Sequence, residues 1–354
     1  MLTDLRLQHF RSYKDASFEF GAGVNIIVGP NASGKTNLLE AILVLARGTS
    51  YRVRDTDLVQ FKQDWARLDS HLDDGSQRSL KLVLAPEPSK TYEIAGKPFK
   101  RLTLAHSLPT VLFEPNHLQL LSGSPERRRD YLDDLIEQTT PGYGAVRRQY
   151  RRTLAQRNAL LKSRPQDLQK QLFAWDVRLS QLGGQIVRAR HELTKRINNE
   201  MPLLYRELAH ISGKQPGVMA EYAATWPPEN YESQLLKKLA TSIELDQDRG
   251  FTGSGPHRED LLVSIGGHPA SAAASRGETR TLVLALKIIE LKLLAEARDT
   301  TPLLLLDDVF SELDGSRRRA LTEHLAPYQT FITTTDADII THHFTDSCTV
   351  LALK

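Results

Sequence analysis

The stretch that decides the fold is Gly29-Pro-Asn-Ala-Ser-Gly-Lys-Thr36, which fits the pattern G-x-x-x-x-G-K-[ST] at every fixed position. The apolar run Val24–Val28 before it is typical of a buried strand, and the run TNLLEAILVLA from Thr36 is typical of a helix. Backbone N–H groups of such a glycine-rich turn can converge on phosphate oxygens, and the helix start adds a favourable potential. The alternative is a joint that merely tolerates glycine; the flanking strand and helix favour a phosphate loop.

The phosphate loop predicts a nucleotide site that uses Mg²⁺. Lys35 is expected to reach the β- and γ-phosphates, and the Thr36 hydroxyl is expected to ligate Mg²⁺. The predicted nucleotide-binding residues of the loop are Gly29, Pro30, Asn31, Ala32, Ser33, Gly34, Lys35 and Thr36.

A second stretch, LLLLDDVFSELDG from Leu303, carries the acids that a triphosphate site needs. Four leucines predict a strand buried on both faces, as in a parallel sheet. Asp307 at its tip can hold Mg²⁺ directly or through a water, which is the Walker B role. Asp308 is expected to point elsewhere, because strand side chains alternate, and could polarise the attacking water. The alternative is two aspartates that cap a strand end beside a turn.

The stretch Ser275-Arg-Gly-Glu278 is a capping box, in which the Ser275 oxygen caps a helix and Glu278 reaches back. A buried stripe follows it at helical spacing: Leu282, Ala285, Leu286, Ile289 and Leu293. A plain helix start is therefore a complete structural explanation. In the ATP-binding-cassette (ABC) class, however, such a start presents its serine, glycine and dipole to the γ-phosphate held by another copy's loop. The helix after the phosphate loop and the helix that begins at Ser275 would each bind an anion at its N-terminus. Together they would complete two nucleotide sites across a dimer.

The character of the sequence changes along its length of 354 residues. Short strands are expected in the first hundred residues and helices from Pro125 to about Ser212, and a mixture of strands and helices is expected again from about Phe251. Spacings of three and four in the helical part predict two seams of packed helices or a short coiled coil: Leu172, Trp175, Leu179, Leu182 and Ile186, then Ile197, Met201, Leu204, Leu208 and Ile211. The stretch QPGVMAEYAATWPPENY between them is expected to be a loop. We predict an α/β fold, an ABC-type P-loop ATPase head (1–115 and 251–354) with an inserted α-helical second lobe (116–250).

The composition indicates the cellular compartment in which the protein is expected. One cysteine, Cys348, excludes a disulfide framework and favours a reducing compartment. The N-terminal text MLTDLRLQHFRSYKD lacks the apolar core of a signal peptide, and the apolar runs are shorter than a membrane span. We expect a soluble, cytoplasmic protein with no membrane partner; its net charge of +3 does not by itself indicate nucleic acid.

The motifs together resemble one family. LQHFRSY followed by GPNASGKTNLLEAI resembles the heads of SMC and Rad50 proteins. SPERRRDYLDD, SGPHREDLLVSIGG, ASRGETRTLVLALK and LLLLDDVFSELD, in this order along the whole chain, resemble the RecF family of DNA replication and repair proteins. The resemblance implies ATP with Mg²⁺, ATP-dependent homodimerisation on DNA and slow hydrolysis that releases it. It also implies RecR and RecO as partners and assistance in loading RecA at gaps, where single-stranded and double-stranded DNA meet.

The resemblance implies roles for individual residues as well. Lys35 and Asp308 hold the catalytic positions, Thr36 and Asp307 the metal positions, and Arg11 matches an arginine near the phosphates. The in-trans signature is Ser275, Arg276, Gly277 and Glu278, and the D-loop at the dimer interface includes Ser311 and Asp314. Gln119 is the candidate for the Q-loop, while His257 and Arg258 match a family motif without an assigned role.

Two departures from the broader cassette class concern the attack of water. The catalytic acid Asp308 is one methylene shorter than the usual glutamate, and Thr335 stands where a switch histidine is usual. Both predict weak positioning of water, so that hydrolysis is a slow timer.

The helical text carries a basic cluster. No acid occurs between Gln138 and Gln166, and the pairs Arg147–Arg151 and Arg148–Arg152 share helix faces at i, i+4. Like charges on neighbouring turns need a counter-charge, which DNA phosphates would supply with little base preference and a steep salt dependence. The alternative is a solvated face, or arginines paired with acids elsewhere in the fold. Weaker candidates are Arg127–Arg129, Arg188, Arg190, Lys195 and Arg196.

Other functions fit less well. An SMC- or Rad50-like structural DNA-tethering head is the main alternative, but the insertion 116–250 is short for a long tether. A nucleotide-gated nuclease would need a further carboxylate cluster, and a small-molecule kinase would not explain the signature-type helix or the late acidic strand.

Overall fold

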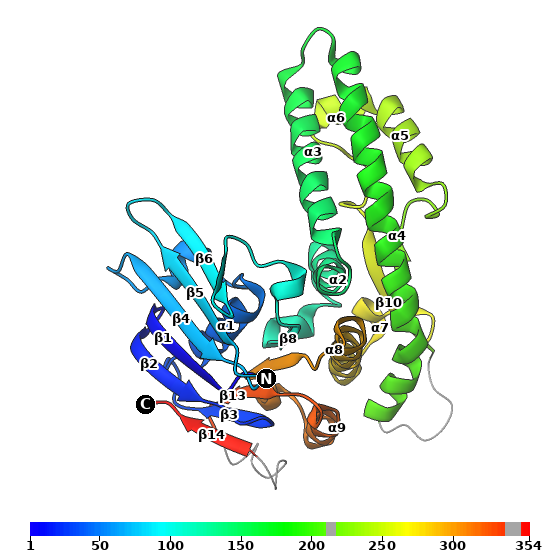
Figure 1. Ribbon diagram of the computed structural model, residues 1–354. Helices are drawn as coiled ribbons and strands as arrows, with labels where there is room; N and C mark the ends of the chain where they lie inside the picture. The colour runs from blue at the N-terminus through cyan, green and yellow to red at the C-terminus, as the bar shows by residue number, and fades with distance from the viewer. Residues whose placement is uncertain (210–216, 337–347) are drawn as a thin grey trace. The chain divides into compact units, whose positions relative to one another are not determined.

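The computed structural model describes residues 1–209, 217–336 and 348–354, and its contacts divide the chain into two compact units (Figure 1). Unit 1 comprises Met1–Leu118 and Lys287–Lys354, and unit 2 comprises Gln119–Leu286. Within the described ranges, the strands form three sheets, two in unit 1 and one in unit 2.

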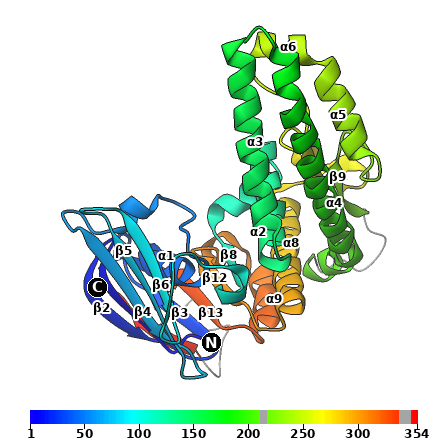
Figure 2. The ribbon, with the colours of Figure 1, turned by 45° about the horizontal axis from the view of Figure 1, so that its top comes forward.

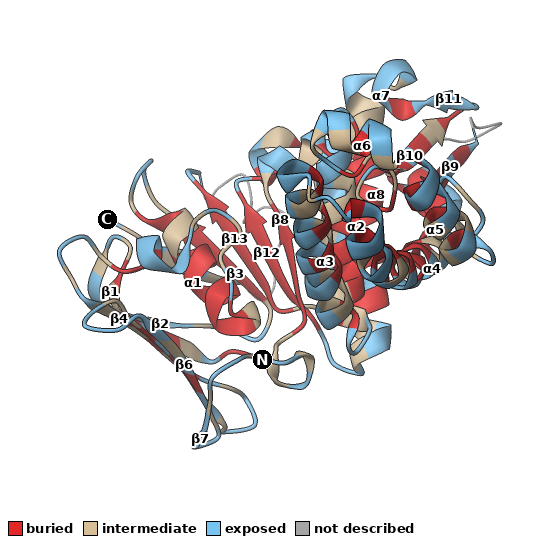
Figure 3. Cartoon of the chain, turned by 90° about the horizontal axis from the view of Figure 1, so that it is seen from above, coloured by how far each residue is buried: buried red, intermediate tan, exposed pale blue. Residues whose placement is uncertain are grey.

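The parallel sheet of unit 1 has the strand order β14-β3-β13-β12-β8. Four of its strands are almost wholly buried, as Figure 3 shows in red, which confirms the parallel-sheet prediction drawn from the four leucines. All carboxyl ends therefore meet at one edge of the sheet. The strands are β3 (Val24–Val28), β8 (Thr110–Phe113), β12 (Leu303–Asp307), β13 (Thr330–Thr334) and β14 (Cys348–Ala352).

The second sheet of unit 1 is antiparallel, in the order β2-β1-β4-β5-β6-β7. One apolar cluster joins it to the parallel sheet through α1 (Lys35–Arg47): Leu7 of β1, Ile42 of α1 and Leu305 of β12 are all fully buried in it. The strands are β1 (Asp4–Phe10), β2 (Tyr13–Glu19), β4 (Trp65–His71), β5 (Gln77–Val83), β6 (Ser89–Ile94) and β7 (Lys97–Phe99). The other helical segments are α9 (Gly315–Leu325) and the short 3₁₀ helices η1 (Asp55–Leu58), η2 (Leu104–His106), η3 (Pro115–Gln119) and η4 (Phe310–Glu312).

Unit 2 is mainly helical. Helices α3 (Tyr143–Ser163) and α4 (Leu168–Leu208) run side by side (Figure 2), and the predicted seam residues Leu172, Leu179 and Ile186 are buried. Ile211, the last residue of the second predicted seam, lies outside the described residues. The other helices are α2 (Pro125–Thr139), α5 (Tyr231–Thr241), α6 (Ile243–Arg249), α7 (Ala270–Ala273) and α8 (Arg276–Arg298), which passes from unit 2 into unit 1 at Lys287.

The loop expected around residues 215–231 contains a strand, β9 (Val218–Ala223), so this part of the prediction was wrong. Its side chains alternate between buried Val218, Ala220 and Tyr222 and the exposed Met219 and Glu221. β9 pairs antiparallel with β10 (Asp260–Ile265), which also pairs with β11 (His268–Pro269). Because this sheet ties residues 251–286 to the helices, the second unit boundary falls after Leu286, whereas the sequence placed a domain boundary after residue 250.

No helix in the described ranges combines the length and the apolar character that crossing a membrane requires.

Candidate nucleotide-binding site

The phosphate loop connects β3, which ends at Val28, to α1, which begins at Lys35. Gly34 has φ +99°, a conformation that favours glycine, and a Cβ built there would lie 2.8 Å from the Tyr13 hydroxyl. That hydroxyl donates a hydrogen bond to the Gly34 carbonyl at 3.1 Å. The turn between β1 and β2 therefore rests against the loop, and only glycine fits at this contact.

Lys35 is 9% exposed, and its ammonium donates to the carbonyls of Gly29 at 2.7 Å and Pro30 at 2.8 Å. Both acceptors are neutral and belong to the loop itself. The ammonium is therefore held over the loop, where the charge of a phosphate would be stabilised.

Asp307 joins the loop to the end of β12. Its Oδ1 accepts hydrogen bonds from the hydroxyls of Thr36 at 3.0 Å and Thr333 at 2.8 Å, and its Oδ2 accepts one from Tyr51 at 3.3 Å. Thr333 lies opposite Asp307 in the parallel ladder, which explains this contact. A hydroxyl and a carboxylate 3.0 Å apart are hard oxygen donors of the kind that Mg²⁺ prefers, so the residues present fit this metal.

Asp308 lies just beyond β12 and has a left-handed backbone, with φ 53°. Its direction is therefore set by this turn, and not by strand alternation as the sequence suggested. Partial burial raises the pKa of its carboxyl, with a further contribution from the charge of Asp307. Asp308 lines a groove of about 360 Å³ together with Lys35, Thr36 and Asp307, and Thr335 lines the same groove.

Arg11 does not line this groove, and its expected place near the phosphates stays a prediction. Its guanidinium forms an ion pair at 3.0 Å with the fully buried Glu40 of α1 and donates to the Asp57 carbonyl at 3.1 Å. Arg11 lines a neighbouring groove instead. The buried acid that holds it could not be identified from the sequence, where Glu40 is one polar residue in an apolar helix.

Three further residues belong to the phosphate groove or its border and were missed by the sequence analysis. Arg52 and Thr333 line the groove, while Glu114 follows β8, directly after the residue that is paired with Leu306. Burial raises the pKa of Glu114, and the nearby charge of Asp307 raises it further. The order of strands in the sheet brings Glu114 beside Asp307, and that order is not written in any local motif.

The signature-type residues lie in unit 2, at the start of α8. The Ser275 N–H donates to Glu278 Oε2 at 2.8 Å, and the Glu278 N–H donates to Ser275 Oγ at 3.2 Å. The capping box is therefore confirmed, and these hydrogen bonds lower the pKa of Glu278. Ser275 and Arg276 are exposed, whereas Gly277 and Glu278 are half-buried.

The two predicted D-loop residues have local partners in unit 1. The Ser311 hydroxyl donates to the Asp308 carbonyl at 2.7 Å. Asp314 caps α9 by accepting from the Arg317 N–H at 3.0 Å, which holds its pKa at about 2.

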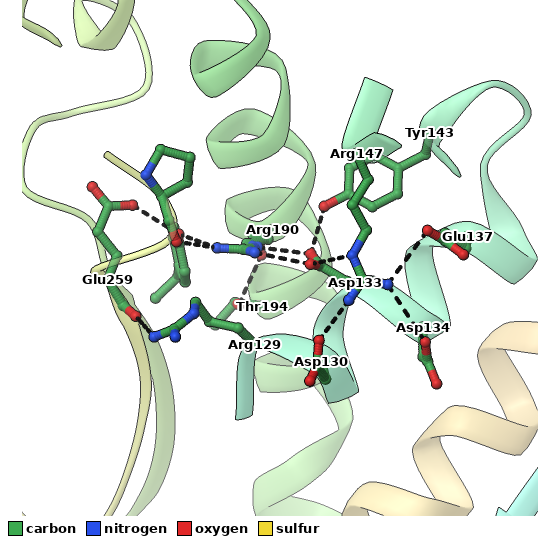
Figure 4. Close-up of polar contacts among 12 residues, drawn as sticks. Arg129, Asp130, Asp133, Asp134, Glu137, Tyr143, Arg147, Arg190, Thr194 and Glu259 are labelled. Carbon is green, nitrogen blue, oxygen red and sulfur yellow. Dashed lines mark hydrogen bonds and ion pairs between the residues drawn. The ribbon is translucent and has the colours of Figure 1, made fainter. Parts of the chain in front are cut away.

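The arginine cluster of α3 separates into two kinds of side chain, and Figure 4 shows the paired kind, Arg147. Arg147 is only 11% exposed, and its guanidinium contacts Asp133 at 2.9 Å and Asp130 at 2.5 Å, both on α2. Arg147 is therefore paired with acids within the fold, the alternative that the sequence analysis gave for this cluster. The prediction that Arg147 contacts DNA is corrected. Arg148, Arg151 and Arg152 are exposed, although Arg151 lies 3.8 Å from Asp130.

The same internal pairing explains other arginines of unit 2. Arg190 forms a bidentate pair with Asp133 at 2.8 and 2.9 Å, and Arg157, fully buried, contacts Asp176 at 2.6 Å and Asp246 at 2.7 Å. Arg190 is thereby removed from the weaker DNA candidates.

His257 and Arg258 of the GPHRED stretch also have structural partners. His257 Nδ1 lies 2.7 Å from the Tyr150 hydroxyl and Nε2 lies 3.1 Å from the Thr252 carbonyl, so Nε2 carries the proton. Burial lowers the pKa of His257 to about 4. The Arg258 guanidinium lies 4.6 Å from the centre of the Phe251 ring. These contacts give both residues a role in holding unit 2 together.

Gln119, the candidate for the Q-loop, accepts a hydrogen bond from Arg127 at 3.2 Å. Its assignment to the Q-loop stays a prediction.

A parallel sheet with a phosphate loop and an acidic strand tip, flanked by an antiparallel sheet, defines an ABC-type head of the kind found in SMC proteins. The family model described as RecF/RecN/SMC N terminal domain matches residues 1–351. The DNA replication and repair protein RecF of Synechococcus sp. (strain JA-3-3Ab) is 37% identical over 345 residues, 94% of this chain and 90% of that protein. The chain therefore belongs to the RecF family.

Solved structures agree with this assignment. The recombination mediator protein RecF-ATPrS in the RecFOR pathway has 30% identity and a TM-score of 0.88, covering 99% of this chain and 96% of that one. An SMC head bound to the C-terminal winged-helix domain of ScpA has 16% identity and a TM-score of 0.56, covering 97% and 91%, and shows the fold alone.

Proposed function

We propose that this chain is an ATP-dependent DNA-binding protein of recombinational repair whose bound nucleotide acts as a switch. The observation that carries the proposal is the hydrogen bond from Thr36 to Asp307, which joins the phosphate loop to the acidic strand. Membership of the RecF family, and relatives described as DNA replication and repair proteins and as RecF-ATPrS, support it.

In this proposal Lys35 binds the β- and γ-phosphates, and Thr36 with Asp307 holds Mg²⁺. The metal, when bound, supplies positive charge that stabilises the triphosphate. Asp308 lies at the same groove and accepts the proton of the attacking water. Its short side chain, together with Thr335 in place of a histidine, makes water positioning weak, so that hydrolysis is a slow timer.

A second copy of the chain completes each site. Ser275, Arg276, Gly277 and Glu278 of one copy would meet the γ-phosphate held by the other, and Ser311 and Asp314 would lie at the interface. The exposure of Ser275 and Arg276 at a capped helix start supports this assignment. ATP then favours the dimer, and hydrolysis releases it from DNA.

DNA is bound through its backbone by Arg148, Arg151 and Arg152 on the exposed face of α3. We propose junctions of single-stranded and double-stranded DNA as the target and RecR and RecO as partners, with RecA loading as the outcome. The name RecFOR, carried by the similar solved RecF, supports the partners, and the cytoplasm is the proposed location.

A tethering head of the SMC kind is the alternative. A long tether needs long helical arms, and the longest helix in the described ranges, α4, has 41 residues, about 60 Å at the rise of an α-helix. This length suits a compact second lobe.

Sedimentation velocity tests the switch, with ATP, ADP or no nucleotide, each with and without gapped DNA. We expect a dimer with ATP, strengthened by DNA, and a monomer with ADP. A chain that stays monomeric at saturating ATP and DNA while it hydrolyses ATP at its full rate would contradict the proposal.

The salt dependence of DNA binding tests the α3 surface. Replacing Arg148 and Arg152 by alanine should reduce the slope of log affinity against log salt by about one for each phosphate that an arginine no longer neutralises. Arg6→Ala is the matched control, because Arg6 is 53% exposed in unit 1, pairs with Asp15 at 2.9 Å and is not a candidate DNA contact. An unchanged slope in the double variant would remove α3 from the interface.

A further inference from the structure

Strand β13 carries three buried threonines, Thr330, Thr333 and Thr334. The hydroxyls of Thr330 and Thr334 donate to main-chain carbonyls two residues away, those of Tyr328 at 3.1 Å and Asp336 at 3.0 Å. The hydroxyl of Thr333 instead reaches the neighbouring strand β12. Burying a hydroxyl costs free energy unless it is hydrogen-bonded, and valine has nearly the same shape without a polar group. The threonine at position 333 is therefore best explained by what its hydroxyl contacts on β12.

The Thr333 hydroxyl joins two consecutive acids of the phosphate groove. It donates to Asp307 Oδ1 at 2.8 Å and accepts from the Asp308 N–H at 2.9 Å. The Leu306 carbonyl lies farther from this hydroxyl, at 3.5 Å, and is neutral, so the carboxylate is the stronger acceptor. Because the hydroxyl both donates and accepts, each hydrogen bond of this chain polarises the other. The position of Asp307 and the turn at Asp308 are therefore linked through one side chain.

The turn at Asp308 is held at both of its main-chain polar groups. Its φ of 53° is a left-handed conformation, which is unfavourable for residues other than glycine. Thr333 accepts from its N–H, and the Ser311 hydroxyl donates to its carbonyl at 2.7 Å. These two hydrogen bonds stabilise the turn, and the turn sets the direction of the Asp308 side chain. Loss of the Thr333 hydroxyl would therefore disturb Asp307 and Asp308 together.

We propose that Thr333 is a positioning residue for ATP hydrolysis, which aligns the carboxylate of Asp307 with that of Asp308. The inference rests on the proposed function, because it takes Asp307 to hold Mg²⁺ and Asp308 to accept the proton of the attacking water. Thr333 acts through these two acids and not on the nucleotide. Removing a hydrogen-bond partner of a metal ligand typically costs about tenfold to a hundredfold in metal affinity or activity. A hydroxyl at position 333 is therefore expected to affect both.

Single-turnover hydrolysis of ATP by the full chain, and calorimetric titration with ATP in Mg²⁺ and in EDTA, test this role. Thr333→Val removes the hydroxyl and keeps the shape. It should lower the hydrolysis rate and weaken ATP binding in Mg²⁺, each by about tenfold to a hundredfold, and leave ATP binding in EDTA unchanged. Thr333→Ser keeps the hydroxyl and should restore most of both. Thr330→Val removes another buried hydroxyl from the same strand; it is the matched control and should change neither.

The outcomes separate this inference from the proposed function. If Thr333→Val hydrolyses ATP as fast as the unaltered chain and binds it equally well in Mg²⁺, the positioning role is overturned while the function stands. Equal losses in Thr333→Val and Thr333→Ser also overturn it, because the hydroxyl would not be the group responsible. Equal weakening of ATP binding in Mg²⁺ and in EDTA overturns it as well, since the phosphate loop itself would then be disturbed. If the unaltered chain neither binds nor hydrolyses ATP, the proposed function itself fails.

Discussion

The buried charges of the phosphate site in unit 1 and the buried arginines of unit 2 have opposite kinds of partner. In unit 1, Lys35 and Asp307 are 9% and 8% exposed, and Lys35 donates to neutral loop carbonyls. In unit 2, Arg157 and Arg190 are 0% and 4% exposed, and carboxylates face both. The comparison teaches that burial alone does not distinguish a binding charge from a structural one. At the phosphate loop, a buried cation whose partners are neutral is available to a ligand, whereas the arginines paired with acids are already satisfied.

The largest effect is expected from breaking the internal pairing. Arg157→Ala leaves Asp176 and Asp246 buried without their cation, which should reduce the free energy of unfolding by about 3–5 kcal/mol. Urea unfolding followed by circular dichroism measures it. Arg152→Ala, on the exposed face of the same helix, should change it by less than about 0.5 kcal/mol. Similar losses in both variants would show that the pairing is not what stabilises unit 2.

Acid should act on unit 2 through His257. Its pKa is about 4 in the folded chain and 6.5 ordinarily, so between these values the unfolded chain binds a proton that the folded chain does not. Stability is then complete above pH 6.5 and falls with decreasing pH, by about 3 kcal/mol at pH 4. Between pH 7 and pH 4, the free energy of unfolding should fall less in His257→Gln than in the unaltered chain, each measured against its own value at pH 7. His268→Gln, at an exposed histidine, serves as the control and should keep the original slope.

Lys35 is expected to have a smaller effect on stability, and only when nucleotide is bound. ATP at a hundred times its dissociation constant should stabilise the chain by about 2.7 kcal/mol. Lys35→Ala should lose most of this gain while unfolding normally without nucleotide. Thermal unfolding with and without MgATP measures both, and a variant that still gains the full amount would show that Lys35 does not bind the phosphates.

The smallest expected effect separates the capping role of Ser275 from its proposed role in trans. Ser275→Ala removes one cap hydrogen bond and should cost about 1 kcal/mol. Ser275→Asp keeps a capping oxygen, so stability should be nearly unchanged, but its negative charge would oppose a γ-phosphate and abolish the ATP-dependent dimer. A dimer of normal strength in Ser275→Asp would leave Ser275 with the structural role only.

Sequence reasoning succeeded for local structure that is encoded by neighbouring residues. The phosphate loop, the strand Leu303–Asp307 and the capping box at Ser275 each depend on local spacing, and each has the predicted local structure. The arginines of α3 were harder, because their partners are on another helix. A usable signal did exist: Asp130, Asp133 and Glu137 share a face of α2, and a short turn leads from α2 to α3.

Other features had no local signal. The places of Tyr51 and Glu114 beside Asp307 depend on the order of strands in the sheet, which follows from packing of the whole unit. β9 did show a period of two, but the prolines and glycines around it suggested a loop. The division of the chain after Leu286 follows from the pairing of β9 with β10, which joins distant segments.

The strand that leads into the phosphate loop has neighbours that are synthesised late. β3 lies between β13 and β14, and the side chain of Asn25 reaches the carbonyl of Thr330 across 305 residues of sequence. During synthesis, β3 therefore emerges from the ribosome long before the strands that cover its two edges. Until then its exposed edges are open to pairing with other chains, so chaperone supply during expression should govern how much nucleotide-competent protein is recovered.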